Sequence, residues 1–361
     1  MICKKIYYSH FRNIESAVIE PEPGVNLLYG ENAEGKTNAL EGIYLLAQGR
    51  SHRTVHENEF IMQGSTGAVI QMIYRDAKRD QRLEMRFLGK GKKVCAKNGV
   101  YLKKMSEFIG NFRAVLFCPE HLSMVKSGPA ERRAFADGGI AQLDASHVVN
   151  LQRYNSILAQ RNQLIKSAAT EKKAFEDTIR LWSEQLAEYA EKVGIARARY
   201  MERVDLHVKN IFDDMTCGRE IPSFRCKKTL SRDEYYKVFT ENIDKELRAG
   251  ITLYGPHKDD IEIFLCGQSA RSFASQGQQR SLAVAMKLAE GEISREVGGE
   301  YPVFLMDDLL SELDGKRSEY LLNTFHDRQV IITGCSAESV RQYAGKGLFR
   351  VEKGRYTKLS C

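Results

Sequence analysis

Two kinds of apolar pattern alternate along this chain. Short, largely apolar runs at residues 25–29, 303–306 and 329–332 are typical of strands buried in a parallel sheet. Elsewhere, apolar residues recur at steps of three and four, which indicates helices that bury one face. One such helix is expected to begin near Gln276, and its apolar residues are Leu282, Ala285, Met286, Ala289 and Ile293. The pattern as a whole predicts an α/β fold, with a mixed sheet flanked by helices.

The middle of the chain has a different pattern. Residues 145–169 and 172–215 carry long helical periodicities, and few strand signals interrupt them. A helix of about 40 residues would span about 60 Å at about 1.5 Å per residue, which is long enough to project from a head. We therefore predict a helical lobe at residues 121–249, inserted between an N-terminal part of the head at 1–120 and a C-terminal part at 250–361.

An eight-residue string directly follows the first apolar run. It reads Gly30-Glu31-Asn32-Ala33-Glu34-Gly35-Lys36-Thr37, the complete pattern G-x-x-x-x-G-K-[ST] of a phosphate-binding loop. The glycines allow backbone N–H groups to point inward at the phosphates, Lys36 would reach the β and γ phosphates, and the Thr37 hydroxyl would hold Mg²⁺. Apolar residues at helical spacing follow the loop, so the required order of strand, loop and helix is present. We predict that these eight residues bind ATP and that Lys36 also assists its hydrolysis.

Two carboxylates stand at the end of another predicted strand. Asp307 and Asp308 directly follow the apolar run at 303–306. Ligands bind at the carboxyl ends of the strands in an open α/β sheet, so we expect both side chains near the phosphates. Asp307 is predicted to bind Mg²⁺, and Asp308 to orient or deprotonate the attacking water.

The residues around the start of the helix at Gln276 form a third candidate site. Ser275 suits the N-cap position, and Gly277 would permit the close approach of another group. The exposed N–H groups of a helix N-terminus can bind phosphate. Taken alone, the sequence Ser-x-Gly-Gln is an ordinary helix cap.

The order of these pieces resembles that of an ABC-type ATPase head. A phosphate loop, a Ser-x-Gly-Gln helix, an apolar strand that ends in two aspartates, and then Ser311-Glu312-Leu313-Asp314 follow one another along the chain. In proteins of that class, two ATP molecules are held between two chains. The resemblance implies that Ser275, Gly277 and Gln278 contact the γ phosphate bound by a second copy, and that residues 311–314 lie across the dimer interface.

Several further strings narrow the family. They are Phe11-Arg12-Asn13, Gly49-Arg50-Ser51-His52-Arg53-Thr54, Cys118-Pro119-Glu120-His121-Leu122, Trp182-Ser183-Glu184-Gln185-Leu186 and Gly255-Pro256-His257-Lys258-Asp259-Asp260. Together they resemble the RecF family of bacterial DNA replication and repair proteins, which are relatives of the SMC ATPases without the long coiled coil. The resemblance implies an ATP-dependent homodimer with a weak, DNA-dependent ATPase. It also implies binding to duplex, gapped or junction DNA, cooperation with RecR and RecO, and assistance to RecA loading. It adds Arg12 to the residues that bind the nucleotide.

Two positions depart from the pattern of ABC transporters. Asp308 is one methylene shorter than the glutamate usual there, so we expect slow hydrolysis. Thr333 follows the run at 329–332, where a transporter has a histidine near the γ phosphate. We expect Thr333 to replace that histidine in part.

Charge adds a weaker indication of the partner. The formal net charge of +7 favours an anionic partner without establishing one. Lys90, Lys92, Lys93 and Lys97 fall in a stretch whose alternation and glycines suggest a β-hairpin, and we expect these lysines to contact DNA phosphates. The alternative that stays open is a hairpin whose lysines only prevent pairing with other strands.

Cysteine usage and hydropathy bear on the compartment. The eight scattered cysteines form no C-x-x-C pair, and this is typical of reduced thiols in an intracellular protein without a zinc site. No secretion signal is recognisable, and no apolar run approaches the roughly 20 residues that cross a bilayer. We therefore expect a cytoplasmic protein with no membrane partner.

Two other functions stay open on the sequence. The chain could be the motor subunit of an ABC transporter, although the missing transporter residues and the Gly-Pro-His-Lys-Asp-Asp string count against this. It could also be a nucleotide-gated DNA clamp in which ATP turnover is incidental.

Overall fold

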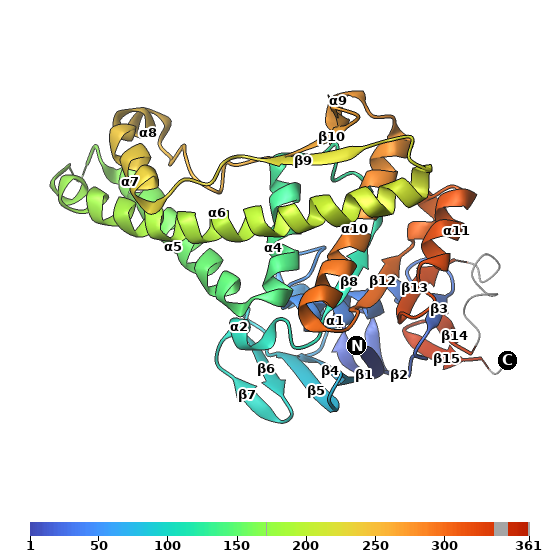
Figure 1. The fold of residues 1–361 in the computed structure, drawn as a ribbon. Coiled ribbons are helices and arrows are strands. Elements are labelled where there is room, and N and C mark those ends of the chain that lie inside the picture. Colours follow the sequence, from blue (N-terminus) through green and yellow to red (C-terminus); the bar gives the residue numbers. More distant parts are fainter. Residues whose placement is uncertain (171, 336–345, 360–361) are drawn as a thin grey trace.

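The structure is a computed structural model, and it describes residues 1–170, 172–335 and 346–359. An α/β head carries a long helical arm that extends from one side (Figure 1). Strands from both ends of the chain lie side by side in the head, whereas the middle of the chain forms the arm. The predicted fold class, an α/β head with a mixed sheet and flanking helices, is confirmed.

One sheet forms the centre of the head. Across the described residues its order is β15-β14-β3-β13-β12-β8, and β15 alone runs antiparallel to its neighbour. The strands are β3 (Val25–Tyr29), β8 (Ala114–Phe117), β12 (Val303–Asp307), β13 (Val330–Gly334), β14 (Leu348–Glu352) and β15 (Arg355–Lys358). The three apolar runs predicted as strands are thus β3, β12 and β13. Because these three are parallel neighbours, their carboxyl ends lie together at one edge of the sheet.

A second sheet of the head is antiparallel, with the order β2-β1-β4-β5-β6-β7. Its strands are β1 (Ile2–Phe11), β2 (Ile14–Ile19), β4 (Ala68–Arg75), β5 (Asp80–Phe87), β6 (Lys93–Lys97) and β7 (Val100–Leu102). The lysine-rich stretch therefore forms hairpins, as predicted, and these lie at one end of this sheet.

The helix α1 (Lys36–Gln48) lies between the two sheets. Its Leu40 is fully buried in a hydrophobic core that includes residues of both sheets. Side chains alternate across a strand, so Leu28 of β3 joins this core while Leu27 joins the core on the opposite face. There the central sheet is covered by α10 (Gln276–Gly298), which begins where the sequence predicted a helix. The central sheet is therefore buried on both faces, which explains its uninterrupted apolar strands.

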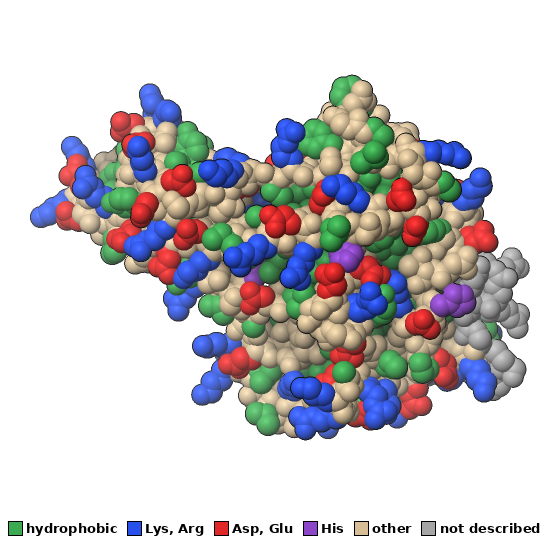
Figure 2. Space-filling model, in the orientation of Figure 1, with side chains coloured by type: hydrophobic (Ala, Val, Ile, Leu, Met, Phe, Trp, Pro, Cys, Tyr) green, Lys and Arg blue, Asp and Glu red, His purple; other side chains and the backbone are tan. Residues whose placement is uncertain are grey.

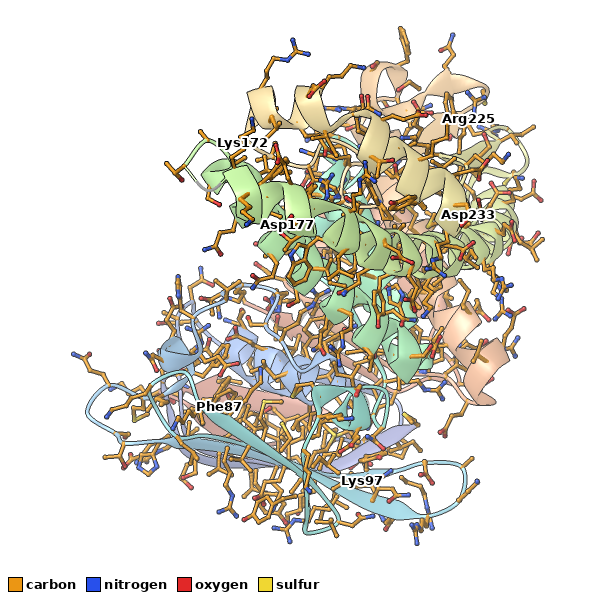
Figure 3. The ribbon with its side chains drawn as sticks, turned by 90° about the vertical axis from the view of Figure 1, so that its left-hand side faces the viewer. Phe87, Lys97, Lys172, Asp177, Arg225 and Asp233 are labelled. Carbon is orange, nitrogen blue, oxygen red and sulfur yellow. The ribbon has the colours of Figure 1, made fainter. Side chains whose placement is uncertain are left out.

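The arm consists mainly of α5 (Ala145–Ser167) and α6 (Lys172–Thr216), which pack against each other. They confirm the helices predicted at 145–169 and 172–215 to within two residues. Figure 3 views the arm from its far end, with Lys172 at the start of α6 above the antiparallel sheet that carries Lys97. The second half of α6 packs against α10 and belongs to the core of the head.

A third, small sheet also connects the arm to the head. The strand β9 (Pro222–Cys226) follows α6 and pairs with β10 (Ile261–Leu265), which in turn pairs with β11 (Gln268–Ser269). Residues of the proposed lobe at 121–249 therefore share a sheet with later residues. The lobe boundaries stay a prediction.

Further helices connect these parts. They are α2 (Met105–Phe108), α3 (Pro119–Leu122), α4 (Pro129–Leu143), α7 (Arg232–Glu241), α8 (Ile243–Ala249), α9 (Ala270–Phe273), α11 (Gly315–Asn323) and the 3₁₀ turns η1 (Glu57–Phe60) and η2 (Leu309–Glu312). The seven cysteines in the described ranges are all free. A helix with the length and apolar character of a membrane span is not found in those ranges.

Candidate nucleotide-binding site

The predicted phosphate loop joins β3 to the N-terminus of α1. Lys36 bends back over the loop, and its ammonium donates to the backbone carbonyls of Gly30 and Glu31, each at 2.6 Å. A side chain at Gly30 would place its Cβ atom 2.2 Å from the carbonyl oxygen of Val351, so only glycine fits there. Gly35 has a φ of +112°, which also favours glycine. The backbone of this chain therefore explains why both positions of the motif are glycine.

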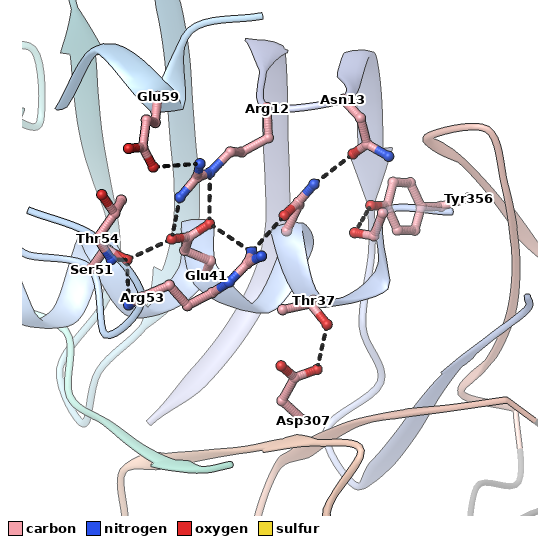
Figure 4. Close-up of polar contacts among 12 residues, drawn as sticks. Arg12, Asn13, Thr37, Glu41, Ser51, Arg53, Thr54, Glu59, Asp307 and Tyr356 are labelled. Atoms are coloured by element: carbon pink, nitrogen blue, oxygen red, sulfur yellow. Dashed lines mark hydrogen bonds and ion pairs between the residues drawn. The ribbon is translucent and has the colours of Figure 1, made fainter. Parts of the chain in front are cut away.

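The two residues predicted to hold Mg²⁺ meet at the edge of the sheet. The Thr37 hydroxyl donates to a carboxylate oxygen of Asp307 at 2.8 Å (Figure 4). Asp307 is 8% exposed and lies at the end of β12, whereas Thr37 lies in the first turn of α1. A hydroxyl and a carboxylate at this distance are suitable ligands for one magnesium ion. The metal-binding role of both residues stays a prediction.

Thr333 lies beside Asp307 at the ends of two neighbouring strands. Its hydroxyl donates to the same oxygen of Asp307 at 2.8 Å, and its side chain is 2% exposed. The parallel register of β12 and β13 pairs Asp307 with Thr333, so both side chains lie on the same face of the sheet. Thr333 thus supports the Asp307 carboxylate from a buried position, and its expected replacement of a histidine at the γ phosphate stays a prediction.

Asp308 lies at the surface in an unusual backbone conformation. Its φ is +46°, in the left-handed region that few residues other than glycine adopt, and it precedes the 3₁₀ turn η2. Its N–H donates to the Thr333 hydroxyl at 3.0 Å, which helps to hold this conformation. The exposed carboxylate remains our candidate for positioning water.

The start of α10 has the cap that the sequence predicted. Ser275 is the N-cap, and its side chain and that of Gln278 bond reciprocally to the backbone in a capping box. The Gln278 amide also donates to the carboxylate of Glu220 at 2.7 Å. Gly277 lies against Arg317, since a Cβ atom there would be 3.0 Å from the guanidinium. Ser275 is exposed, so the helix N-terminus is open to a second molecule.

Arg12 belongs to a polar cluster beside α1 (Figure 4). Its guanidinium donates two bonds, at 3.0 and 2.9 Å, to the fully buried carboxylate of Glu41. Ser51 and Arg53 also donate to Glu41. Burial raises the pKa of this carboxyl, but the bonds from Arg12 and Ser51 outweigh burial and bring the pKa below its usual value. Arg12 therefore faces Glu41 here, and its role in nucleotide binding stays a prediction.

The four hairpin lysines do not share one exposed edge. Lys90 and Lys92 are exposed in the turn between β5 and β6. Lys93 pairs with Glu57 at 2.5 Å, and Lys97 donates to the side-chain oxygen of Asn111 at 2.5 Å. Alternate residues of β6 face inward, which explains why these two lysines have partners within the chain. On the face shown in Figure 2, basic and acidic side chains are interspersed over head and arm.

Sequence reasoning missed the C-terminal hairpin of β14 and β15 as a part of this site. The Tyr356 hydroxyl donates to the carbonyl of Gly35 at 2.8 Å, and the N–H of Gly354 donates to the carbonyl of Glu34 at 2.9 Å. These contacts depend on the pairing of β14 with β3, which lie more than 300 residues apart in the sequence. No local pattern around Tyr356 signals them.

Comparison with known proteins gives a consistent family. The family model described as "RecF/RecN/SMC N terminal domain" matches residues 2–357. The protein named "DNA replication and repair protein RecF" of Clostridium novyi is 35% identical over 98% of this chain and 99% of its own length. The protein of the same name from Clostridium acetobutylicum is 36% identical over 98% and 99% of the two chains.

Solved structures agree with these relatives. A structure described as "recombination mediator protein RecF-ATPrS in RecFOR pathway" has a TM-score of 0.92 at 32% identity, over 99% of this chain and 98% of that chain. An Smc head domain from Pyrococcus furiosus has a TM-score of 0.58 at 16% identity, over 100% and 96% of the two chains, which indicates a shared fold.

Proposed function

The chain belongs to the RecF/RecN/SMC N-terminal domain family, as a RecF protein of DNA replication and repair, and on that premise we propose that it is an ATP-driven homodimer that binds DNA. Its head has the ABC-type ATPase fold. Because the chain belongs to this family, we no longer consider it as the motor subunit of an ABC transporter.

One observation carries the proposal of nucleotide binding. The Thr37 hydroxyl and the Asp307 carboxylate, which are 270 residues apart in the sequence, are 2.8 Å apart beside the loop that Lys36 closes. With ATP bound, we expect Mg²⁺ between these two side chains and the phosphates, and the Lys36 ammonium on the β and γ phosphates instead of on carbonyls. Structures of relatives at 32% identity are described as RecF-ATP and RecF-ATPrS, which supports ATP as the ligand.

Hydrolysis is proposed to be slow and to serve dimer opening. In each half site Asp308 would orient water, and the exposed N-terminus of α10 from a second copy would complete the phosphate contacts through Ser275, Gly277 and Gln278. ATP then stabilises the closed dimer because it binds two chains at once. Loss of the γ phosphate lets the dimer open.

DNA, RecR and RecO are the proposed partners, in the cytoplasm. Lys90 and Lys92 have no ion-pair partner among the described residues and are exposed, so they are our candidates for contacts with DNA phosphates. We further propose that the closed dimer binds duplex, gapped or junction DNA, with a weak ATPase that depends on DNA, and assists RecA loading.

Sedimentation velocity of the pure protein, with and without Mg·ATP, tests the proposed function. We expect the wild type to change from monomer to dimer with ATP, and the change to be larger in the presence of a gapped duplex. Lys36→Ala should bind nucleotide at least about tenfold more weakly and stay monomeric, because it loses a charged contact to phosphate.

Lys192→Ala on the arm, where the lysine pairs with Glu188 and lies over the Tyr189 ring of its own helix, serves as the matched control and should dimerise as the wild type does. Normal dimerisation of Lys36→Ala would overturn the proposal.

A further inference from the structure

Three consecutive carbonyl groups of the phosphate loop accept hydrogen bonds from outside the loop. The Ala33 carbonyl accepts from the side-chain amide of Asn13 at 3.0 Å. The Glu34 carbonyl accepts from the N–H of Gly354 at 2.9 Å, and the Gly35 carbonyl accepts from the Tyr356 hydroxyl at 2.8 Å. Two of these donors belong to the C-terminal hairpin, and the third belongs to the turn after β1.

These bonds fix the direction of the N–H groups that follow. In a planar trans peptide, the carbonyl and the next N–H point in opposite directions. The N–H groups of Glu34, Gly35 and Lys36 therefore point away from Asn13 and the hairpin. None of them has an acceptor among the residues that the structure describes. The Gly35 carbonyl also accepts from Ala39 at 3.0 Å along α1, so the Lys36 N–H points out of the helix N-terminus, where anions bind.

The hairpin reaches the loop because of its place in the central sheet. β14 pairs in parallel with β3, the strand that leads into the loop, and the turn between β14 and β15 then lies against Glu34. The N–H of Lys353 in that turn donates to the Glu34 carboxylate. A Cβ atom at Gly354 would lie 2.7 Å from the carbonyl of Asn13, so the hairpin turn and the turn after β1 are in close contact. The two turns form one support on the outer side of the loop.

We propose that Asn13 and Tyr356 are positioning residues for nucleotide binding, and that the C-terminal hairpin is a part of the nucleotide site. The inference rests on the proposed binding of ATP at this loop. Neither side chain touches the phosphates. Each holds a carbonyl outward, and the three N–H groups thereby face the phosphates before the nucleotide arrives. Such preorganisation raises affinity, because less conformational freedom is lost on binding.

The proposal predicts a specific pattern of affinities. The held N–H groups precede and begin α1, where they would face the phosphates shared by ATP and ADP. Loss of one of the three hydrogen bonds to the loop carbonyls should therefore weaken ATP and ADP binding by the same factor. A contact to the γ phosphate would instead weaken ATP binding alone.

Calorimetric titration of Tyr356→Phe with Mg·ATP and Mg·ADP tests the proposal. The substitution removes only the hydroxyl, and one lost hydrogen bond predicts a rise in Kd of about 3- to 10-fold for both nucleotides. Asn13→Ala is the second, independent variant and should raise both Kd values by a similar factor. The melting temperature without nucleotide should stay within about 2 °C of the wild type for Tyr356→Phe, because the ring and its packing are kept.

Tyr74→Phe is the matched control, since the Tyr74 hydroxyl is buried without a hydrogen-bond partner in the described structure. It should leave both Kd values unchanged. Unchanged Kd values in Tyr356→Phe and in Asn13→Ala would overturn the inference, as would a loss confined to ATP. If the wild type bound no nucleotide, the proposed function itself would be wrong. If the wild type bound nucleotide tightly and only Lys36→Ala abolished binding, the proposed function would stand and the positioning role of Asn13 and Tyr356 would be refuted.

Discussion

At the scale of single residues, Asp308 combines exposure with a left-handed backbone. Its neighbour Asp307 is buried and bonded to two hydroxyls, so of this pair only Asp308 can move toward a water molecule. For a residue other than glycine, this conformation lowers the stability of the fold by about 1 kcal/mol. The hydrogen bond from the Asp308 N–H to the Thr333 hydroxyl helps to offset that cost. Strain of this kind is common at functional sites, which favours a direct role in ATP hydrolysis.

Asp308→Asn tests that role. Asparagine has the same size and tolerates a positive φ, so the fold should be unchanged while the negative charge is lost. We predict that phosphate release falls at least about tenfold, because a general base or water-orienting group is removed. The ATP-bound dimer should then persist longer. A phosphate-release assay measures the rate of hydrolysis, and the decay of the dimer after ATP is removed measures its lifetime. Unchanged values for both would instead favour a nucleotide-gated clamp with incidental turnover.

Residues of the site could be predicted where the signal is local. The phosphate loop and the Ser275 cap were predicted correctly as structures because each depends on a few consecutive residues. The contact of Thr333 with Asp307 was missed because it depends on the register of β13 against β12. Asn13 and Tyr356 were missed as supports because their partners come from distant segments.

At the scale of elements, the hairpins of β5 to β7 present two kinds of lysine. Lys90 and Lys92 extend from the turn, whereas Lys93 and Lys97 point inward and bond to Glu57 and Asn111. The sequence predicted a basic hairpin. The difference between the two sets depends on the structure, because Lys90 and Lys92 lie in the turn whereas Lys93 and Lys97 lie in β6. The helices of the arm were easier to predict, because one apolar stripe continues over many turns.

The double variant Lys90→Ala/Lys92→Ala tests whether this turn meets DNA. Each phosphate contact contributes about 0.9 to the slope of log affinity against log salt, so we expect duplex affinity to fall and the slope to flatten by about 1 to 2. Fluorescence anisotropy at several salt concentrations measures both. Lys172→Ala/Lys173→Ala removes the same charge at the start of α6 and should keep the wild-type slope. If the slope of log affinity against log salt were the same in the two variants, the turn would not contact DNA.

At the scale of the whole molecule, the phosphate loop and the N-terminus of α10 are separate parts of the head. In Figure 1, α10 begins just after α9 at the top of the head, whereas β3 and α1 lie lower. The order of motifs along the sequence predicted both parts, but their separation depends on the fold. In the single chain, Glu220 holds the Gln278 amide at 2.7 Å. To contact a nucleotide on a second chain, the Gln278 side chain would use the second N–H of this amide or leave Glu220.

A mixing experiment tests most directly whether two chains complete one nucleotide site. Lys36→Ala lacks a working phosphate loop, and Ser275→Arg would block the N-terminus of α10 while leaving its own loop intact. We predict that each variant alone stays monomeric with Mg·ATP in sedimentation velocity. Mixed in equal amounts, they should form a dimer, because one of its two sites combines an intact loop with an intact α10 N-terminus. Dimerisation of Ser275→Arg alone at the wild-type ATP concentration, or a mixture that stays monomeric, would contradict a site shared between two chains.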